Sequence, residues 1–432
     1  MTPREDMIER EIAEHKRSNK DASYAIELRG TKVYLPVIRV NPDNLLLNHK
    51  NNRLSGQLKD HPMRANVEAD PESTECQALL HTLLARTAKF KDLKKQLDAL
   101  GQKEPGLIRR DGLLVNGNTR VAALRDLKIG YVEVAVLPPT IDDNDVLDME
   151  MSLQVTDLVH QDYTFTNELL LMRRYLDSGN SPAALAKKMG WIRQGLKKVD
   201  TQLRLLSYIE EVRTLSPIPY NVFDTKNQHL QDLDNDYMRL KNQGNVDAAE
   251  SLKWSRLMMT FLNLNKDNVR AIDENFVDEK LLPRFDSDSQ VTKNHLETYR
   301  AENVDDGLDD LLGEQSTKTI DMKKVLNDFL NDEGNRDESG GVKKDITSLY
   351  ANMAFKAKLA TENIIYDQKL ESANAAPSES LKDTRVKIKT IKQKLHLIMR
   401  DPRFKIEKFL FDIDELMDEL NALKKEVNDT YD

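Results

Sequence analysis

The chain has 432 residues, a net charge of −9 and a charged fraction of 32%, whereas hydrophobic residues make up 39%. This composition predicts a soluble, helix-rich protein of two or three domains with modest cores. Its single cysteine, Cys76, excludes an intramolecular disulfide framework and a CxxC zinc or redox site. No apolar run is long enough to span a membrane and the N-terminus is too charged for a secretory signal, so we expect a cytoplasmic location.

The predicted elements begin with a charged helix over residues 1–25. Apolar residues at helical spacing predict further helices at 76–99 and 118–127, and residues 372–380 have the composition of a linker. Short apolar runs bounded by turn residues predict four strands, at 32–38, 107–110, 112–116 and 131–137. From about residue 145 onwards the patterns are helical. We therefore expect an α+β protein with a small mixed sheet, followed by a long all-α C-terminal region.

A glycine turn joins the third predicted strand to the helix at 118–127. Gly at such a corner brings free backbone N–H groups to a helix N-terminus, which is a natural seat for a phosphate or another anion. Arg120 in the first helical turn adds a guanidinium that can grip such an anion with two hydrogen bonds. The alternative is a turn that only fixes the strand–helix corner, with Arg120 paired to a local carboxylate. The predicted nucleotide- or phosphate-binding residues are Gly117, Asn118, Thr119 and Arg120.

The stretch 182–206 has the spacing of a helix-turn-helix, with a first helix over 182–189 and a recognition helix from Ile192 onwards. Small residues allow the two helices to cross closely, a glycine allows the left-handed turn, and two apolar residues anchor the second helix. In that order, these residues are Ala186, Gly190, Leu196 and Val199.

Charge supports this reading, because eight basic and two acidic residues lie between Arg173 and Arg204 in a chain that is acidic overall. We predict that Arg193 and Gln194 touch base edges and that four lysines hold phosphates. The alternative is a helical pair whose lysines are only solvated. The predicted DNA-binding residues are Lys187, Lys188, Arg193, Gln194, Lys197 and Lys198, and we expect Arg204 to be exposed further along the helix.

Two other patterns bear on function. The acidic run at 142–150 would suit a nuclease if its carboxylates gathered around a metal ion. Near the C-terminus, apolar residues recur every three or four positions at 388–398 and at 409–427, as on the seam of a coiled coil. These helices would form a hairpin that packs on itself or on a second copy.

The order of the pieces over residues 31–155 resembles the ParB/sulfiredoxin-like N-terminal domain. In that family a strand ending in Asn-Pro precedes a helix and a strand, and a Gly-x-x-Arg turn then opens a helix containing alanines. The family also places a helix-turn-helix directly after this domain, as the sequence does at 182–206. The matching residues are Asn41, Pro42, Leu97, Gly101, Pro105, Gly117, Arg120, Ala122 and Ala123.

The resemblance implies DNA as a partner and a nucleoside triphosphate, CTP or ATP with Mg²⁺, as a ligand of the glycine turn. Asn118 stands where nucleotide-hydrolysing members carry an acidic residue, and Met151-Ser152 stand near their Glu-Asn pair. Two carboxylates that would hold the metal are therefore missing, which argues against hydrolysis by the family's usual route. Asn118 also occupies the slot of the reactive cysteine of sulfiredoxins, so redox catalysis is not expected.

We therefore expect a ParB-like, nucleoid-associated DNA-binding protein that acts in partition, transcriptional control or a mobile element and self-associates, as a dimer, through its C-terminal helices. The alternatives left open are a ParB-like nuclease or nucleotide-using enzyme, and a non-enzymatic interaction scaffold. The predicted domains are a helical extension (1–30), the α/β domain (31–150), the helix-turn-helix (151–210), a helical domain (211–371) and a C-terminal hairpin or coiled coil (380–432).

Overall fold

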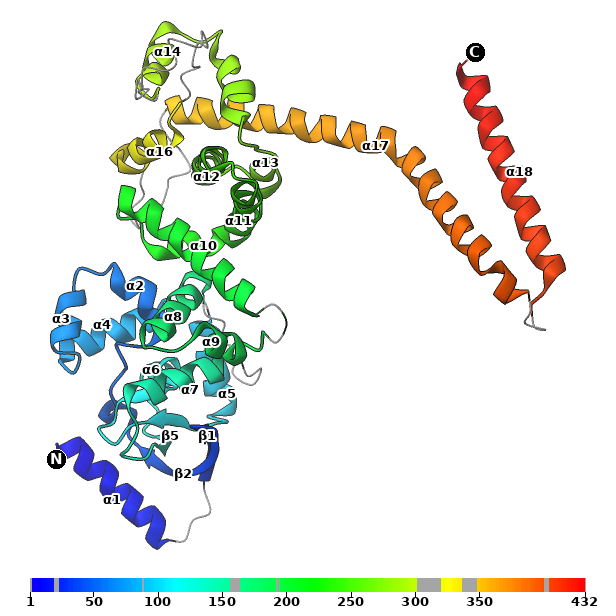
Figure 1. The fold of residues 1–432 in the computed structure, drawn as a ribbon. Coiled ribbons are helices and arrows are strands. Elements are labelled where there is room, and N and C mark those ends of the chain that lie inside the picture. The colour runs from blue at the N-terminus through cyan, green and yellow to red at the C-terminus, as the bar shows by residue number, and fades with distance from the viewer. Residues whose placement is uncertain are drawn as a thin grey trace. The chain divides into compact units, whose positions relative to one another are not determined.

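The computed structural model describes residues 2–18, 23–87, 89–155, 164–191, 193, 195–300, 320–335, 348–399 and 404–431. These residues form two compact units, 1–361 and 362–432 (Figure 1). A small sheet and many helices make up the first unit, so the α+β class expected from the sequence is confirmed. Within the described ranges, no helix combines the length and the apolar character needed to cross a bilayer.

The five strands form one mixed sheet in the order β1-β2-β5-β3-β4. Only the β3–β5 pair is parallel, and the β1–β2, β2–β5 and β3–β4 pairs are antiparallel. The strands are β1 (Ser23–Leu28), β2 (Thr31–Val40), β3 (Gly106–Ile108), β4 (Leu114–Asn116) and β5 (Val132–Val136).

Strand β1 corrects the sequence prediction, because the helix expected over 1–25 ends at Arg17 in α1 (Pro3–Arg17). Residues 23–28 instead pair with β2 through a turn in which Arg29 and Gly30 both have positive φ. Backbone pairing with a neighbouring strand overrides the weak local helical pattern here.

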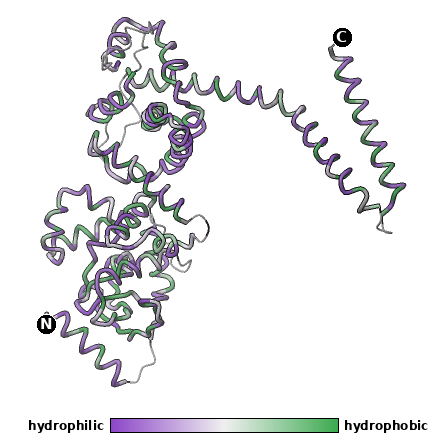
Figure 2. Tube along the Cα trace, in the orientation of Figure 1, coloured by the Kyte–Doolittle hydropathy of each residue, from purple (hydrophilic) through white to green (hydrophobic). Residues whose placement is uncertain are grey.

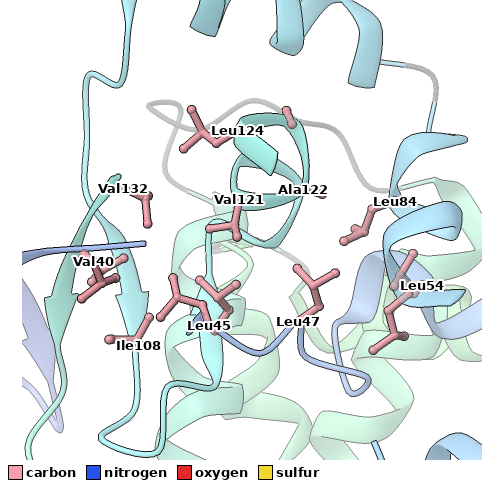
Figure 3. Packing of buried hydrophobic residues seen from close by; sticks show 14 of the residues in the cluster. Val40, Leu45, Leu47, Leu54, Leu84, Ile108, Val121, Ala122, Leu124 and Val132 are labelled. Carbon is pink, nitrogen blue, oxygen red and sulfur yellow. The ribbon is translucent and has the colours of Figure 1, made fainter. Parts of the chain in front are cut away.

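One face of the sheet is covered by α1, α4, α5 and α6, and Figure 3 shows part of this core, including Val40, Ile108 and Val121. The helix predicted over 76–99 is two helices, because the chain turns after Ala85 and thereby buries both Leu84 and Phe90 in the same core. The short helices α2 (Ser55–Lys59) and α3 (Arg64–Ala69) precede them. The remaining bounds are α4 (Thr74–Ala85), α5 (Phe90–Leu100) and α6 (Asn118–Asp126).

Helix α7 (Asp143–Val155) joins the sheet to the helices that follow it. Val146 and Met149 pack on the opposite face of the sheet. Leu147 and Met151, on the other side of α7, pack with α8 (Phe165–Asp177), α9 (Pro182–Lys188) and α10 (Gly195–Leu215). The sheet and the helical module therefore share one helix, which fixes their relative orientation.

The described residues after α10 are mainly helical. Residues 372–380, predicted as a linker, lie inside α17 despite Pro377. Alanines at 375 and 376 favour the helix, and proline removes only one hydrogen bond of this long helix. The bounds are α11 (Asn227–Asn242), α12 (Val246–Phe261), α13 (Lys266–Arg270), α14 (Gln290–Glu297), α16 (Met322–Asn331), α17 (Ser348–Ile398) and α18 (Ile406–Tyr431).

In the second unit, hydrophobic and hydrophilic positions alternate along α17 and α18 (Figure 2). The apolar positions predicted to form a seam on α18 are largely exposed, among them Ile413, Leu420, Leu423 and Val427. Within one chain, the two helices therefore do not bury these apolar positions against each other. Packing on a second copy stays a prediction.

Candidate functional site

The glycine turn has the geometry predicted for it. Gly117 precedes α6 with a left-handed φ of 92°, a conformation that costs a residue with a Cβ about 1 kcal/mol or more. A Cβ at Gly117 would also approach the Cα of Gly106 in β3 to 3.2 Å. Gly117 has no side chain that could cap the first turn of α6.

These residues open onto a pocket of about 410 Å³, here called the cationic pocket. One wall is the start of α6 and the other is α5, which contributes Leu93 and Leu97. Four basic and two acidic side chains line it, so its charge favours an anion. The lining residues are Arg53, Lys89, Asp92, Leu93, Gln96, Leu97, Gly101, Lys103, Glu104, Asn116, Gly117, Thr119 and Arg120.

Arg120 is a cation of this pocket that makes a hydrogen bond to the chain itself. Its Nη1 donates to the backbone oxygen of Glu104 at 2.6 Å. Burial lowers the pKa of Arg120, and the charge of Glu104 only partly opposes that shift. Glu104 also lines the pocket, and its charge is the nearest opposing influence on this guanidinium. A largely desolvated guanidinium on a pocket wall is well suited to hold an anion.

Asn118 does not belong to the pocket, which corrects the sequence prediction. Its side chain is 2% exposed, its Oδ1 accepts from the backbone N–H of Asn48 at 2.8 Å, and its amide group faces the oxygen of Leu114 at 3.4 Å. Thr119 does line the pocket, and its hydroxyl accepts from Arg53 Nη1 at 3.3 Å. Gly117, Thr119 and Arg120 therefore line the pocket, whereas the side chain of Asn118 stabilises the fold through its hydrogen bond with Asn48.

The acidic run at 142–150 does not gather around a common point. Asp143 pairs with Lys50, Asp142 and Asp145 share one arginine, and Asp148 and Glu150 have separate partners. Those pairs are Arg29 with Asp142 and Asp145, Lys188 with Asp148, and Asn52 with Glu150. In the part of the chain that the structure describes, no group of three or more His, Cys, Asp or Glu residues is placed to hold a metal. The carboxylates of the acidic run therefore do not gather at one metal site within the described residues, as a metal-dependent nuclease would require.

Glu150 is buried beside the loop that follows β2. It accepts a hydrogen bond from Asn52 Nδ2 at 2.5 Å and lies 4.0 Å from Arg174 Nη1. Burial raises the pKa of this carboxyl to about 8, against the opposing effect of Arg174 and Arg53. The group is therefore mostly protonated at neutral pH and ties α7 to its neighbours as a neutral acid.

Helices α9 and α10 lie in the stretch predicted as a helix-turn-helix, and Gly190 between them has a left-handed φ of 68°. The predicted crossing at Ala186 occurs, but its partner is Gly195, where an added Cβ would lie 2.8 Å from the Ala186 Cβ. Val199 is buried as predicted, whereas Leu196 is 56% exposed. Leu196 is therefore not an anchor, because Gly195 takes the place against α9 and turns the next residue outwards.

The basic residues of this module divide into exposed and engaged groups. Lys187, Arg193, Lys197 and Lys198 are exposed, and Lys198 Nζ lies 4.3 Å from the centre of the Trp191 ring. The predictions for Lys188 and Arg204 are corrected, because both side chains are paired within the chain. Gln194 lies outside the described residues. These pairs are Lys188 with Asp148 at 2.6 Å and Ser152 at 2.9 Å, and Arg204 with Asp234 at 2.7 Å.

Sequence reasoning missed three cations of the cationic pocket: Arg53, Lys89 and Lys103. None of them lies in the glycine turn, and they come from three separate segments of the chain. The tertiary fold brings these three segments together around the pocket. The sole signal in the sequence is the basic character of the segments around residues 50, 90 and 103, which is too common to single them out.

Comparisons with known proteins give distant structural similarities. No protein-family description and no curated protein sequence matches the chain. The chain is similar to a Pnob8-like ParB-N domain, with a TM-score of 0.29 and 14% identity over 56% of this chain and 90% of that one. It is also similar to the C-terminally truncated chromosome-partitioning protein ParB from Caulobacter crescentus complexed with CTP-γ-S, with a TM-score of 0.19 and 16% identity over 46% of this chain and 92% of that one.

Proposed function

We propose that this protein binds duplex DNA through α9 and the N-terminal end of α10. The observation that carries the proposal is the exposure of four cations, Lys187, Arg193, Lys197 and Lys198, around one helix start in a chain of net charge −9. Basic side chains gathered on one helical module supply the sequence-independent contacts to phosphates. Partition, transcriptional control and service to a mobile element are the roles that the family resemblance suggests, at the nucleoid in the cytoplasm.

Two adjacent lysines provide the matched test. Lys187 is exposed, whereas Lys188 is held by Asp148 and Ser152. We expect Lys187→Ala and Lys197→Ala each to weaken binding to a duplex and to lower the slope of log K against log salt by about 1. Lys188→Ala should leave both quantities near the wild-type values. Binding that is insensitive to salt, or equal losses for both neighbours, would contradict the proposal.

We also propose that the cationic pocket binds the phosphate groups of a nucleotide such as CTP or ATP. Arg120 supports this, because it is buried, charged and open to the pocket. The opposite wall offers the apolar side chains of Leu93 and Leu97, against which a base or ribose can pack, beside the polar Gln96. The arrangement joins an apolar wall to a cationic wall, which matches the two halves of a nucleotide.

A nucleotide panel tests the pocket. Binding of CTP, ATP, GTP and ADP to the full chain is measured by calorimetry, with and without duplex DNA. Arg120→Ala should lower the affinity at least ten-fold, since it removes a charge-assisted contact. Lys94→Ala is the control, because Lys94 lies on α5 outside the pocket and pairs with Asp126. No nucleotide binding, or equal effects of the two substitutions, would refute this assignment.

Self-association through the C-terminal helices is the third part of the proposal. The exposed apolar positions of α17 and α18 need a cover, and the two helices carry opposite charge. Residues 381–399 contain six lysines or arginines and one acidic residue, whereas α18 contains eight acidic residues and three lysines. In a dimer, the acidic α18 of one copy can therefore pack against the basic residues 381–399 of the other copy.

A further inference from the structure

Leu196 is a large apolar side chain placed where water reaches it. It is the second residue of α10. Gly195 is pressed against Ala186, and Val199 fills the core below, so the start of α10 cannot rotate to bury Leu196. No other part of the described chain covers it, since 56% of its surface is exposed. An exposed leucine fixed at a helix start has a cost in water that a binding partner would remove.

Among the described residues on the face of α10 that carries Leu196, Arg204 lies two turns further along and is engaged by Asp234. Asp200, one helical turn further along the same face, is exposed and acidic. Lys197 and Lys198 stand beside this face, and Arg193 precedes it. An apolar and an acidic residue cannot hold phosphates, whereas the cations around them can. If the module docks on DNA, the rim of cations meets the backbone and the Leu196–Asp200 face meets the edges of the bases.

We infer that Leu196 is a specificity-determining residue that contacts the 5-methyl group of a thymine in the major groove. This inference rests on the proposed DNA binding. N-terminal residues of a recognition helix contact base edges, and the thymine methyl is the apolar group that the major groove presents. Asp200, one turn away, is suited to accept a hydrogen bond from the amino group of a cytosine near that thymine.

Replacement of thymine by uracil tests the inference, because it removes only the methyl group. A preferred duplex is first selected from a random pool with the full-length protein, and each thymine is then changed to uracil in turn. We expect one position at which uracil weakens wild-type binding by about four-fold, the effect of losing one buried methyl group. Leu196→Ala should show a similar loss on thymine DNA and no further loss on uracil DNA. This exposed site tolerates alanine without unfolding.

Lys197→Ala is the control, since it should weaken binding equally on thymine and uracil DNA. Uracil effects that persist in Leu196→Ala, or no position sensitive to uracil, would overturn the role of Leu196 while leaving DNA binding in place. Selection of no preferred sequence by a protein that still binds DNA would overturn it as well. Absence of any salt-dependent DNA binding would remove the proposed function itself, and the inference with it.

Discussion

Gly195 and Ala186 touch at the point where α10 crosses α9, and a Cβ at position 195 would lie only 2.8 Å from the Ala186 Cβ. That separation is shorter than carbon atoms accept, so the first residue of α10 has to be glycine for the two helices to cross at this distance. The contact also decides which residue of α10 faces outwards, since it turns Leu196 away from α9.

Gly195→Ala should therefore lower the free energy of unfolding by about 1–3 kcal/mol, because overpacking forces the helices apart. It should also weaken DNA binding, since the exposed cations of α10 move relative to α9. Gly130→Ala is the matched control, because nothing lies within 4 Å of a Cβ at that position. Urea unfolding and a duplex titration measure the two effects. Equal stability of the two variants would contradict the close crossing.

The buried carboxyl of Glu150 should make stability depend on pH. Its folded-state pKa of about 8 lies above its ordinary value of 4.5, so the folded protein holds a proton that the unfolded chain releases. The free energy of unfolding should therefore fall as pH rises from about 5 to 8 and level off above 8. Glu150→Gln keeps the bond from Asn52 and should flatten this dependence.

Urea unfolding at pH 5, 7 and 8 measures the effect. We expect the free energy of unfolding of Glu150→Gln to exceed that of the wild type most at pH 8, by about 2–4 kcal/mol. Glu419→Gln, at an exposed position of α18, should follow the wild-type curve. A free energy of unfolding that has the same pH dependence in the wild type and in Glu150→Gln would refute the assigned protonation.

Asn118 should matter for stability and not for ligand chemistry. Asn118→Ala leaves the buried backbone N–H of Asn48 without its acceptor, which costs about 1–3 kcal/mol. Nucleotide affinity, measured at a temperature where the variant remains folded, should stay within about two-fold of the wild type. The exposed Asn421→Ala serves as the stability control. A ten-fold loss of nucleotide affinity in folded Asn118→Ala would show that the side chain reaches the ligand.

Self-association should depend on the seam of α18. Leu420→Lys places a charge among the apolar positions, and we expect it to raise the dimer dissociation constant at least ten-fold by sedimentation equilibrium. Asn421→Lys adds the same charge one position away from the seam and should have a much smaller effect. High salt should weaken the wild-type dimer, since opposite charges on 381–399 and α18 would be screened. A wild-type chain that stays monomeric at tens of micromolar would refute the proposal.

Much of the local structure follows from the sequence alone. The β-branched run at 131–137 forms β5, Pro182 opens α9, and Gly117 and Gly190 take the left-handed φ expected of turn glycines. These features depend on neighbouring residues in the chain, because backbone conformation and side-chain periodicity are set over a few positions. The sequence was also sufficient to predict the α+β class and the mixed sheet.

Tertiary structure alone decided which of these side chains are available to a ligand. Asn118 and Arg120 are two positions apart. The side chain of Asn118 is buried and hydrogen-bonded to Asn48, whereas that of Arg120 lines the cationic pocket. Lys187 and Lys188 are adjacent, yet Lys187 is exposed, whereas Lys188 pairs with Asp148 on α7. Leu196 matched an anchor by its spacing and is exposed, because Gly195 took its place. Burial and pairing depend on segments distant in sequence, so local spacing cannot determine them.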